Sequence, residues 1–530
     1  MAHESFAAAD RQGKARCFPF RETDQPHGAE TVPRDGFYVC IALPYKLLSL
    51  TVHILFVSSE FHPHAKSGGL ADAVAALAKA LVKRGHRVTV VLPRYASVET
   101  TAFTDLRIPV GVPLGYREEW IGVFQGAHDG VELYLIDHEA LLARPGIYGP
   151  SASSAYEDNL RRFSLLSRGA LQIAMALGWS PRIIHSHDWP TALTPLFHRA
   201  FYGETSLAGA GTVFSIHNFG YQGWYPARDA ENTGLSSQQL DEAGLVAEGE
   251  VNLVRGALRT AGRIVAVSPR YAREIQTAPY GFGLQGEAAG RADHLRGILN
   301  GIDDEEWDPE TDRSIAANFS RHDLSGKGVC KRTLQHEFGL PRNEEIPLVG
   351  MVTRLTEQKG IGALFGPGHG SLYRVCTELP LQFVFLGSGE VWCEEEIRKL
   401  AERLPNFSAI IGYDHALAHR IEAGCDFFLM PSTYEPCGLN QMYAMRYGTI
   451  PIVTATGGLA DTVDEETGFL IRRYSPEGIF LALHEAVRTF LNRKDRIRRM
   501  QDLGMSRDFR WDGSAAAYED VYRELITPNG

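Results

Sequence analysis

The sequence lacks the long apolar runs that a membrane-spanning helix needs. No stretch reaches about 18 apolar residues, and the closest one, residues 37–50, contains Pro44 and Lys46. The first 35 residues also lack the basic start and apolar core of a secretory signal. We therefore expect no membrane partner.

Cysteine is scarce and its spacing is uninformative. The chain has 7 cysteines, an odd number, and no Cys-x-x-Cys motif. Neither a disulfide scaffold nor a zinc ribbon fits this pattern. A reducing cytoplasm is the simplest interpretation.

Positive charge is in deficit. The 53 Lys and Arg residues face 64 Asp and Glu residues, which gives a net charge of -11. This balance argues against a nucleic-acid partner, because a basic surface is the usual electrostatic footprint of such proteins. A local basic cleft for a small anionic substrate remains compatible with it.

From residue 51 onward, the sequence has the pattern of a strand, a helix and a second strand. Residues 53–58 and 87–92 are apolar and β-rich. Between them, four apolar residues recur at helical spacing: Leu70, Val74, Leu77 and Leu81. Gly85 ends this helical stretch. This pattern predicts a βαβ unit and a parallel sheet.

Two successive series of such strands predict an α/β fold with two Rossmann-like domains. The further strands expected in the first series are residues 133–136, 182–185, 212–216 and 263–267. Those of the second series are residues 347–352, 381–387, 408–413, 426–431 and 449–455. We expect four parts: a disordered N-terminal extension (residues 1–50), a first domain (51–300), a second domain (301–500) and a terminal helix that packs back on the first domain (501–530). A turn-rich hinge at 300–309 joins the two domains.

A glycine-rich loop follows the first predicted strand. Lys66-Ser-Gly-Gly-Leu70 precedes a helix, where glycines allow close backbone approach and the helix N-terminus favours an anion. An ordinary turn with a solvated lysine is the alternative. The loop lacks the Gly-x-Gly-x-x-Gly pattern, so a dinucleotide fingerprint is not satisfied.

Histidines gather at another strand end, in His185-Ser-His-Asp-Trp189. A metal there would need ligands from elsewhere in the chain. His and Trp suit hydrogen bonding and stacking with a sugar, and the alternative is a buried structural histidine.

The second series carries cations and a carboxylate at its strand ends. Arg354 and Lys359 could clamp a diphosphate, although a solvated pair is an equal alternative. Glu435, just before a helix, could bind sugar hydroxyls or stabilise a developing cation. Thr456-Gly-Gly-Leu459 could offer backbone N–H groups to phosphate.

Taken in order, these motifs resemble the bacterial glycogen synthase and plant starch synthase family. The resemblance runs from about residue 51 to about residue 525. Beside the loops above, the matching stretches are Tyr156-Glu-Asp-Asn159, Ile216-His-Asn218, Tyr221-Gln-Gly223, residues 268–276, Asn300-Gly-Ile-Asp303, Gly387-Ser-Gly389, residues 431–441 and residues 455–463.

The resemblance implies a GT-B fold and a retaining transfer of glucose from ADP-glucose to the non-reducing end of an α-1,4-glucan such as glycogen or a maltooligosaccharide, with release of ADP. It implies no metal and no cofactor. The catalytic residues carried over are Glu435, Asp158, His187, Arg354 and Lys359. The residues that would bind the nucleotide sugar are Lys66, Gly68, Gly69, Gly387, Tyr413, Thr456, Gly457 and Gly458.

The sequence departs from the family pattern in three places. Pro190 replaces a usual histidine, which removes one polar group near the acceptor. Residues 362–370 contain four glycines and a proline where the family has an apolar helix, and this composition predicts a loop beside the phosphate clamp. The third departure is the extension over residues 1–50.

Three other functions stay open at this point. The donor could be UDP-glucose, because nothing in the sequence separates adenine from uracil. The glycine-rich segment would also suit a catalytically weakened glucan-binding protein. A dinucleotide-dependent oxidoreductase is disfavoured by the missing fingerprint.

Overall fold

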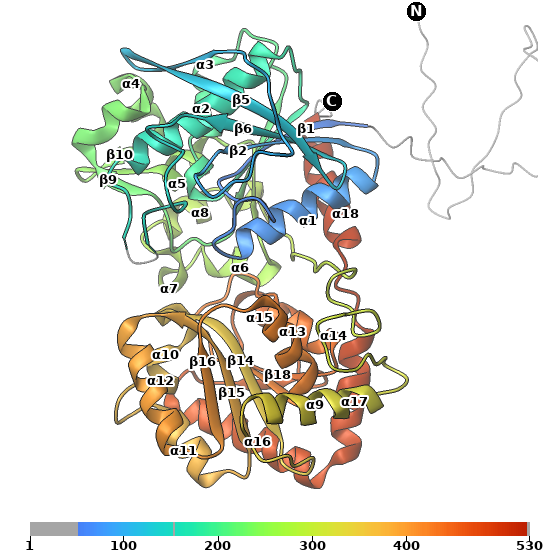
Figure 1. The fold of residues 1–530 in the computed structure, drawn as a ribbon. Helices are drawn as coiled ribbons and strands as arrows, with labels where there is room; N and C mark the ends of the chain where they lie inside the picture. Colours follow the sequence, from blue (N-terminus) through green and yellow to red (C-terminus); the bar gives the residue numbers. More distant parts are fainter. Residues whose placement is uncertain (1–50, 152–153, 527–530) are drawn as a thin grey trace, which may run out of the picture. The chain divides into compact units, whose positions relative to one another are not determined.

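The computed structural model describes residues 51–151 and 154–526. The predicted extension over residues 1–50 lies outside these ranges. The described residues form two lobes: the first comprises residues 51–297 together with the C-terminal helix α18 (Trp511–Ile526), and the second comprises residues 325–506 (Figure 1).

A mostly parallel sheet forms the centre of the first lobe. Its strand order is β13-β12-β8-β7-β1-β2-β6-β5-β3, with β4 paired to β5. The parallel strands include every strand predicted for this half. The bounds are β1 (His53–Val57), β2 (Arg87–Pro93), β3 (Thr104–Asp105), β4 (Val110–Leu114), β5 (Arg117–His128), β6 (Val131–Asp137), β7 (Ile183–His187), β8 (Gly211–Ile216), β12 (Arg263–Ala266) and β13 (Leu295–Gly297).

Helices cover both faces of this sheet, which explains why its strands are continuously apolar. In β1, Leu55 and Val57 pack into one core cluster, whereas Ile54 and Phe56 pack into another. The helices are α1 (Gly69–Lys83), α2 (Asn159–Ala176), α3 (Thr194–Phe201), α4 (Ser237–Ala243), α5 (Leu253–Thr260), α6 (Pro269–Glu274), α7 (Ala278–Gly281) and α8 (Gln285–Gly290). A small antiparallel sheet, which the sequence did not predict, consists of β9 (Trp224–Pro226), β10 (Val246–Ala247) and β11 (Glu250–Asn252).

The second lobe contains a fully parallel sheet. Its strand order is β16-β15-β14-β17-β18-β19, and each strand predicted for this half is present. Alternate residues of β17 point into opposite cores, since Phe427 and Leu429 belong to one cluster and Phe428 and Met430 to the other. The strands are β14 (Leu348–Leu355), β15 (Gln382–Gly389), β16 (Phe407–Ile411), β17 (Phe427–Met430), β18 (Ile450–Thr454) and β19 (Phe469–Ile471).

One prediction for the second lobe is wrong in part. Residues 362–370 do not form a single loop, because a short helix, α10 (Ile361–Phe365), continues through Gly362 and only residues 366–370 are non-helical. Ile361, Leu364 and Phe365 are buried in the core, and this burial offsets the low helix propensity of Gly362. The other helices are α9 (Ser325–Glu337), α11 (Ser371–Glu378), α12 (Val391–Arg403), α13 (His415–Gly424), α14 (Asn440–Arg446), α15 (Gly457–Thr462), α16 (Pro476–Asn492) and α17 (Lys494–Ser506).

The chain returns to the first lobe at its C-terminal end. Helix α18 lies beside α1, and buried Tyr518 and Tyr522 enter the core of the first lobe (Figure 1). The Nδ1 atom of His185 is 2.8 Å from the Tyr522 hydroxyl, and Arg84 forms an ion pair with Glu519. None of the described helices is long and apolar enough to cross a membrane.

Candidate active site

A cleft of about 1570 Å³ lies between the two lobes. Its walls come from the carboxyl ends of strands in both sheets, the edge at which open α/β sheets bind ligands. The predicted site residues that line it are Lys66, Gly68, Gly69, Arg354, Lys359, Gly387, Tyr413 and Glu435. The remaining predicted residues, Asp158, His187, Thr456, Gly457 and Gly458, are not among its lining residues.

Glu435 and Lys359 form an ion pair in the wall of the second lobe. The Lys359 ammonium lies 2.5 Å from the Glu435 carboxylate, which also accepts a hydrogen bond of 3.0 Å from the Ser432 hydroxyl. Only 7% of the Glu435 side chain is exposed. A buried carboxylate needs such partners, because desolvation of an unpaired charge is costly.

Arg354 differs from Lys359 in having a free side chain. It lies within β14, at the carboxyl end of that strand and not in a loop, and its side chain is exposed. Among the described residues, no hydrogen bond or ion pair engages its guanidinium. Its five donors are therefore available to an anion in the cleft.

The glycine-rich loop of the first lobe is already occupied by a carboxylate. Glu60 accepts hydrogen bonds from the backbone N–H groups of Ser67 (2.6 Å) and Gly68 (3.1 Å). Lys66 forms an ion pair of 2.7 Å with Asp72. Partial burial works against the charged lysine, but the Asp72 carboxylate outweighs it and raises the pKa of Lys66.

Gly387 and Tyr413 lie together at one end of the cleft. The Gly412 N–H donates a 3.0 Å hydrogen bond to the Gly387 carbonyl, which joins the ends of β15 and β16. A Cβ atom at Gly387 would lie 2.0 Å from the Thr353 carbonyl oxygen, so the strand pairing requires glycine here. The Tyr413 ring is 77% exposed and offers a flat surface to a ligand.

Asp158 and His187 are not among the residues that line the cleft. Arg144 binds both carboxylate oxygens of Asp158, at 2.9 and 2.7 Å. His187 is fully buried, and its Nδ1 atom lies 3.2 Å from Nε2 of His217. Burial, with the neighbouring His185 and His217, lowers the pKa of His187 well below its ordinary value.

The residue after His187 reaches the cleft in its place. Asp188 lines the cleft and has φ 62 and ψ 178, a conformation that is unfavourable for residues other than glycine. Its carboxylate accepts long hydrogen bonds from the backbone N–H groups of His217 (3.3 Å) and Asn218 (3.4 Å). Burial raises the pKa of Asp188 to about 7.

The predicted phosphate loop at Thr456 is engaged by other protein groups in this structure. The Gly457 N–H donates to both carboxylate oxygens of Glu274, at 3.1 and 3.0 Å, and the Gly458 N–H donates to the Glu435 carbonyl at 3.0 Å. Glu274 belongs to α6 of the first lobe. The Gly457 N–H therefore joins the two lobes, whereas the Gly458 N–H is satisfied within the second lobe.

Known proteins similar to this chain match almost all of its described length. Residues 53–288 match the family model of the starch synthase catalytic domain, and residues 334–504 match that of the glycosyl transferases group 1. A glycogen synthase of Treponema denticola is 42% identical over 89% of this chain and 98% of its own length, and one of an Anaeromyxobacter species is 44% identical over 90% and 100%. The chain belongs to the glycogen synthase family. As a member of it, the protein is a glycosyltransferase.

A solved structure from this family has the same fold. The catalytic domain of starch synthase IV from Arabidopsis thaliana, bound to ADP and acarbose, superposes with a TM-score of 0.83 at 34% identity and covers 90% of this chain and all of that one. A sucrose-phosphate synthase from Thermosynechococcus elongatus has a TM-score of 0.56 at 17% identity, which shows a shared fold alone. The predicted GT-B fold is confirmed.

Several residues that line the cleft were not predicted from the sequence. Glu60, Asp188 and His217 line it, and none was predicted to act there. His217 lies in the Ile216-His-Asn218 stretch, whose two polar residues directly after an apolar strand were a signal. No local pattern marked Glu60, because its role depends on the fold of the loop that follows it. Pro190 is buried and is not among the residues lining the cleft.

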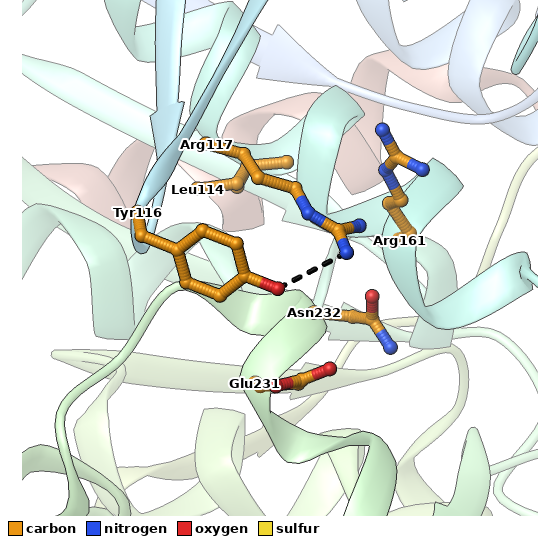
Figure 2. Close-up of a pocket in the computed structure, with 6 residues that line it drawn as sticks. All are labelled: Leu114, Tyr116, Arg117, Arg161, Glu231 and Asn232. Atoms are coloured by element: carbon orange, nitrogen blue, oxygen red, sulfur yellow. Dashed lines mark hydrogen bonds between the residues drawn. The ribbon is translucent and has the colours of Figure 1, made fainter.

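A second pocket lies on the first lobe, beside the turn between β4 and β5. Tyr116, Arg117, Glu231 and Asn232 line it, and Arg117 donates a hydrogen bond to the Tyr116 hydroxyl (Figure 2). Its volume of about 10 Å³ has room for about one water molecule. The interlobe cleft is therefore the candidate active site.

Proposed function

We propose that the protein transfers glucose from ADP-glucose to the non-reducing end of an α-1,4-glucan, with retention of configuration and release of ADP. The observation that carries the proposal is the grouping of Arg354, Lys359 and Glu435 on one wall of the cleft, with Lys66 on the opposite lobe. This grouping suits a reaction in which a diphosphate leaves a sugar carbon that becomes electron-poor.

The cations of the cleft would neutralise the departing diphosphate. No described residue engages the Arg354 guanidinium, whose fork geometry matches phosphate oxygens. Lys359 would bridge between the diphosphate and Glu435, since its ammonium has three donors. Lys66 would approach from the first lobe when the cleft closes, and closure would exclude water that otherwise hydrolyses the donor.

Glu435 would stabilise the positive charge that develops on the transferred glucose. Its carboxylate is preorganised by Lys359 and Ser432 and is shielded from bulk water, which strengthens its electrostatic effect. The paired-carboxylate mechanism would need a second acid opposite Glu435. Arg144 holds Asp158 outside the cleft lining, which gives no support to Asp158 in that role. We therefore favour displacement on one face of the sugar.

The nucleotide base would lie against Tyr413 and Gly387, beside the ends of β15 and β16. The proposed glucan acceptor would enter from the first lobe, where Trp189, His217 and Trp224 line the cleft. The exposed Trp224 ring and the half-buried Trp189 and His217 side chains suit the faces and the hydroxyls of a sugar. The Arabidopsis relative was solved bound to ADP and acarbose, and its ADP supports a nucleotide as a ligand of this protein.

The test is nucleoside diphosphate release from the purified protein, with ADP-glucose and UDP-glucose supplied separately, each with and without glycogen or a short maltooligosaccharide. We expect ADP release that depends on the glucan, and elongated product. Release of UDP alone would show that the donor is UDP-glucose and not ADP-glucose. If folded protein binds glucan but releases a diphosphate from neither sugar nucleotide, the protein is a glucan-binding protein and not a transferase.

A further inference from the structure

A group of metal-ligating side chains that the proposed reaction does not use lies beside the cleft. His415 and His419 come from α13, and Glu306 comes from the segment that joins the lobes. One ligand atom from each of the three residues lies within 4.8 Å of the other two. Among the described residues, no other group of three or more His, Cys, Asp or Glu side chains meets this spacing.

The two histidines have the spacing that suits chelation from a helix. Positions four residues apart lie on the same face of a helix, so the sequence His-Ala-Leu-Ala-His directs both imidazoles to one side. Their ring centroids are 4.8 Å apart. The Nε2 atom of His415 already lies 3.3 Å from a carboxylate oxygen of Glu306.

His419 has an unused nitrogen in a buried position. Its side chain is only 3% exposed, and its Nδ1 atom lies 2.7 Å from the Asp312 carboxylate. Its Nε2 atom is buried and has no hydrogen-bond partner among the described residues. A buried polar atom without a partner is costly, and a bound ligand would remove that cost.

The surroundings of His419 are those of a metal-binding histidine. A carboxylate on one ring nitrogen fixes the tautomer and leaves the other nitrogen free to bind a metal. The Tyr447 hydroxyl also donates to the same Asp312 oxygen, at 2.6 Å, and the ring of His419 stacks on Trp307 with centroids 3.8 Å apart. The imidazole is therefore held in place from two directions.

We propose that Glu306, His415 and His419 bind a zinc ion. Two imidazoles and a carboxylate are a ligand set that zinc accepts, with a fourth position left for water or a cleft ligand. Tetrahedral bonds of about 2.0–2.1 Å place ligand atoms about 3.4 Å apart. The ligand atoms, which now lie within 4.8 Å of one another, would have to come closer. Glu306 and His415, whose side chains are 40% and 42% exposed, can do so by side-chain rotation.

The ion would reach the site through the cleft, because both Glu306 and His415 line it. Glu306 lies beside His415 and favours a cation there. Lys66 also faces His415 and disfavours a cation, whereas Asp72 favours one. The site is separate from the Arg354 and Lys359 clamp, and it does not depend on the proposed donor.

The test is calorimetric titration of the full chain with ZnCl₂ after treatment with a chelator. We expect one saturable site in the unaltered protein, and Zn²⁺ should raise its thermal unfolding midpoint. His415→Ala and Glu306→Gln should each remove this site, because they take away a ligand without altering the buried core. Asp312→Asn should weaken it about 10- to 100-fold by loosening His419.

His336→Ala is the matched control, since His336 is an exposed histidine on α9 that is absent from the cluster. It should leave the site unchanged. The visible absorption of bound Co²⁺ gives a second measurement, and we expect a tetrahedral spectrum that His415→Ala abolishes. Unaltered protein without a saturable site, or His415→Ala protein that binds Zn²⁺ as tightly as the unaltered chain, would overturn the proposal.

Discussion

In the proposed reaction, the Lys359 ammonium contacts both the Glu435 carboxylate and the diphosphate of the donor. In the structure, its short contact with Glu435 satisfies a carboxylate that is almost fully shielded from solvent. A donor diphosphate would compete for the same donors. The roles of the two side chains can therefore be separated by removing them one at a time.

Replacing Glu435 should affect turnover more than binding. We expect Glu435→Ala to lower kcat by about 10²- to 10³-fold, since it removes a charge aimed at the developing cation. ADP affinity should stay the same or rise, because Lys359 loses its competing partner. Steady-state kinetics and ADP titration measure the two effects, with Glu435→Gln as the isosteric comparison. Near-normal kcat in Glu435→Ala would exclude the catalytic role.

Replacing Lys359 should affect nucleotide binding. We expect Lys359→Ala to weaken ADP binding about tenfold, the typical scale of one charge-assisted contact. Lys399→Ala is the matched control, because Lys399 is an exposed lysine of α12 that does not line the cleft. Calorimetric titration with ADP measures both, and an unchanged dissociation constant in Lys359→Ala would argue against the clamp.

Acid pH should destabilise the protein through His217, which follows β8 and contacts His187 of β7. Burial lowers the pKa of His217 from about 6.5 to about 3, so the unfolded chain takes up this proton before the folded protein does. Its contribution is present above pH 6.5 and is lost as the pH falls towards 3. Between pH 7.5 and 5.5, His217→Gln should lose about 1 kcal/mol less stability than the unaltered protein. Urea unfolding at the two pH values tests this, and equal losses would contradict it.

Sequence motifs predicted the residues that are placed by the end of a strand. They did not predict contacts between residues that are far apart in the sequence. Arg354 lies at the carboxyl end of a strand, and Lys359 and Glu435 follow strands of the same parallel sheet, so their shared edge was predictable. Gly457 has the right backbone, but its N–H binds Glu274, which lies 183 residues away in the sequence. No local pattern encodes that contact.

At the scale of elements, the short helix α10 shows how burial overrides composition. Helix propensity, applied to residues 362–370 as one segment, predicts a loop, because glycine and proline strongly disfavour a helix. The structure divides the segment, with the apolar residues in a helix and Pro367 and Gly368 in the connection to α11. The irregular connection is thus short, and Lys359 precedes α10 by one residue, Gly360.

Two glycines, one in the connection after α10 and one in helix α8, offer a test with opposite signs. Gly368 has φ 73, which a residue with a Cβ atom adopts at a cost, so Gly368→Ala should destabilise the protein by about 1 kcal/mol. Gly286 is an exposed residue of helix α8 with open space around its Cα, so Gly286→Ala should stabilise by up to about 1 kcal/mol. Thermal unfolding distinguishes the two, and shifts of equal sign would contradict the conformational argument.

At the scale of the whole molecule, the described lobes are joined by hydrogen bonds from α6 as well as by the chain itself. Glu274 accepts from the Gly457 N–H, the Arg270 N–H donates to Asp461 at 2.7 Å, and Ser268 donates to the Pro436 carbonyl at 2.6 Å. These contacts favour one relative position of the lobes over more open ones.

Removing the carboxylate of Glu274 should shift the population of the free enzyme towards open forms. We expect Glu274→Ala to increase the radius of gyration in small-angle X-ray scattering, and ADP to reverse part of the increase. Glu242→Ala is the control, since Glu242 is exposed on α4 and its hydrogen bond, from Gln238, lies within that helix. The same scattering curve for Glu274→Ala and the unaltered protein would show that this contact does not hold the lobes.

The return of α18 to the first lobe has a consequence for biosynthesis. Residues 51–297 leave the ribosome long before residues 511–526, yet Tyr518 and Tyr522 complete the core of that lobe. Until they arrive, the apolar groove beside α1 is uncovered and His185 lacks the Tyr522 hydroxyl. Folding that proceeds from the N-terminus during translation must therefore leave the first lobe unfinished. The second lobe, made later, can be completed earlier, and the growing chain is exposed to aggregation until its synthesis has passed residue 526.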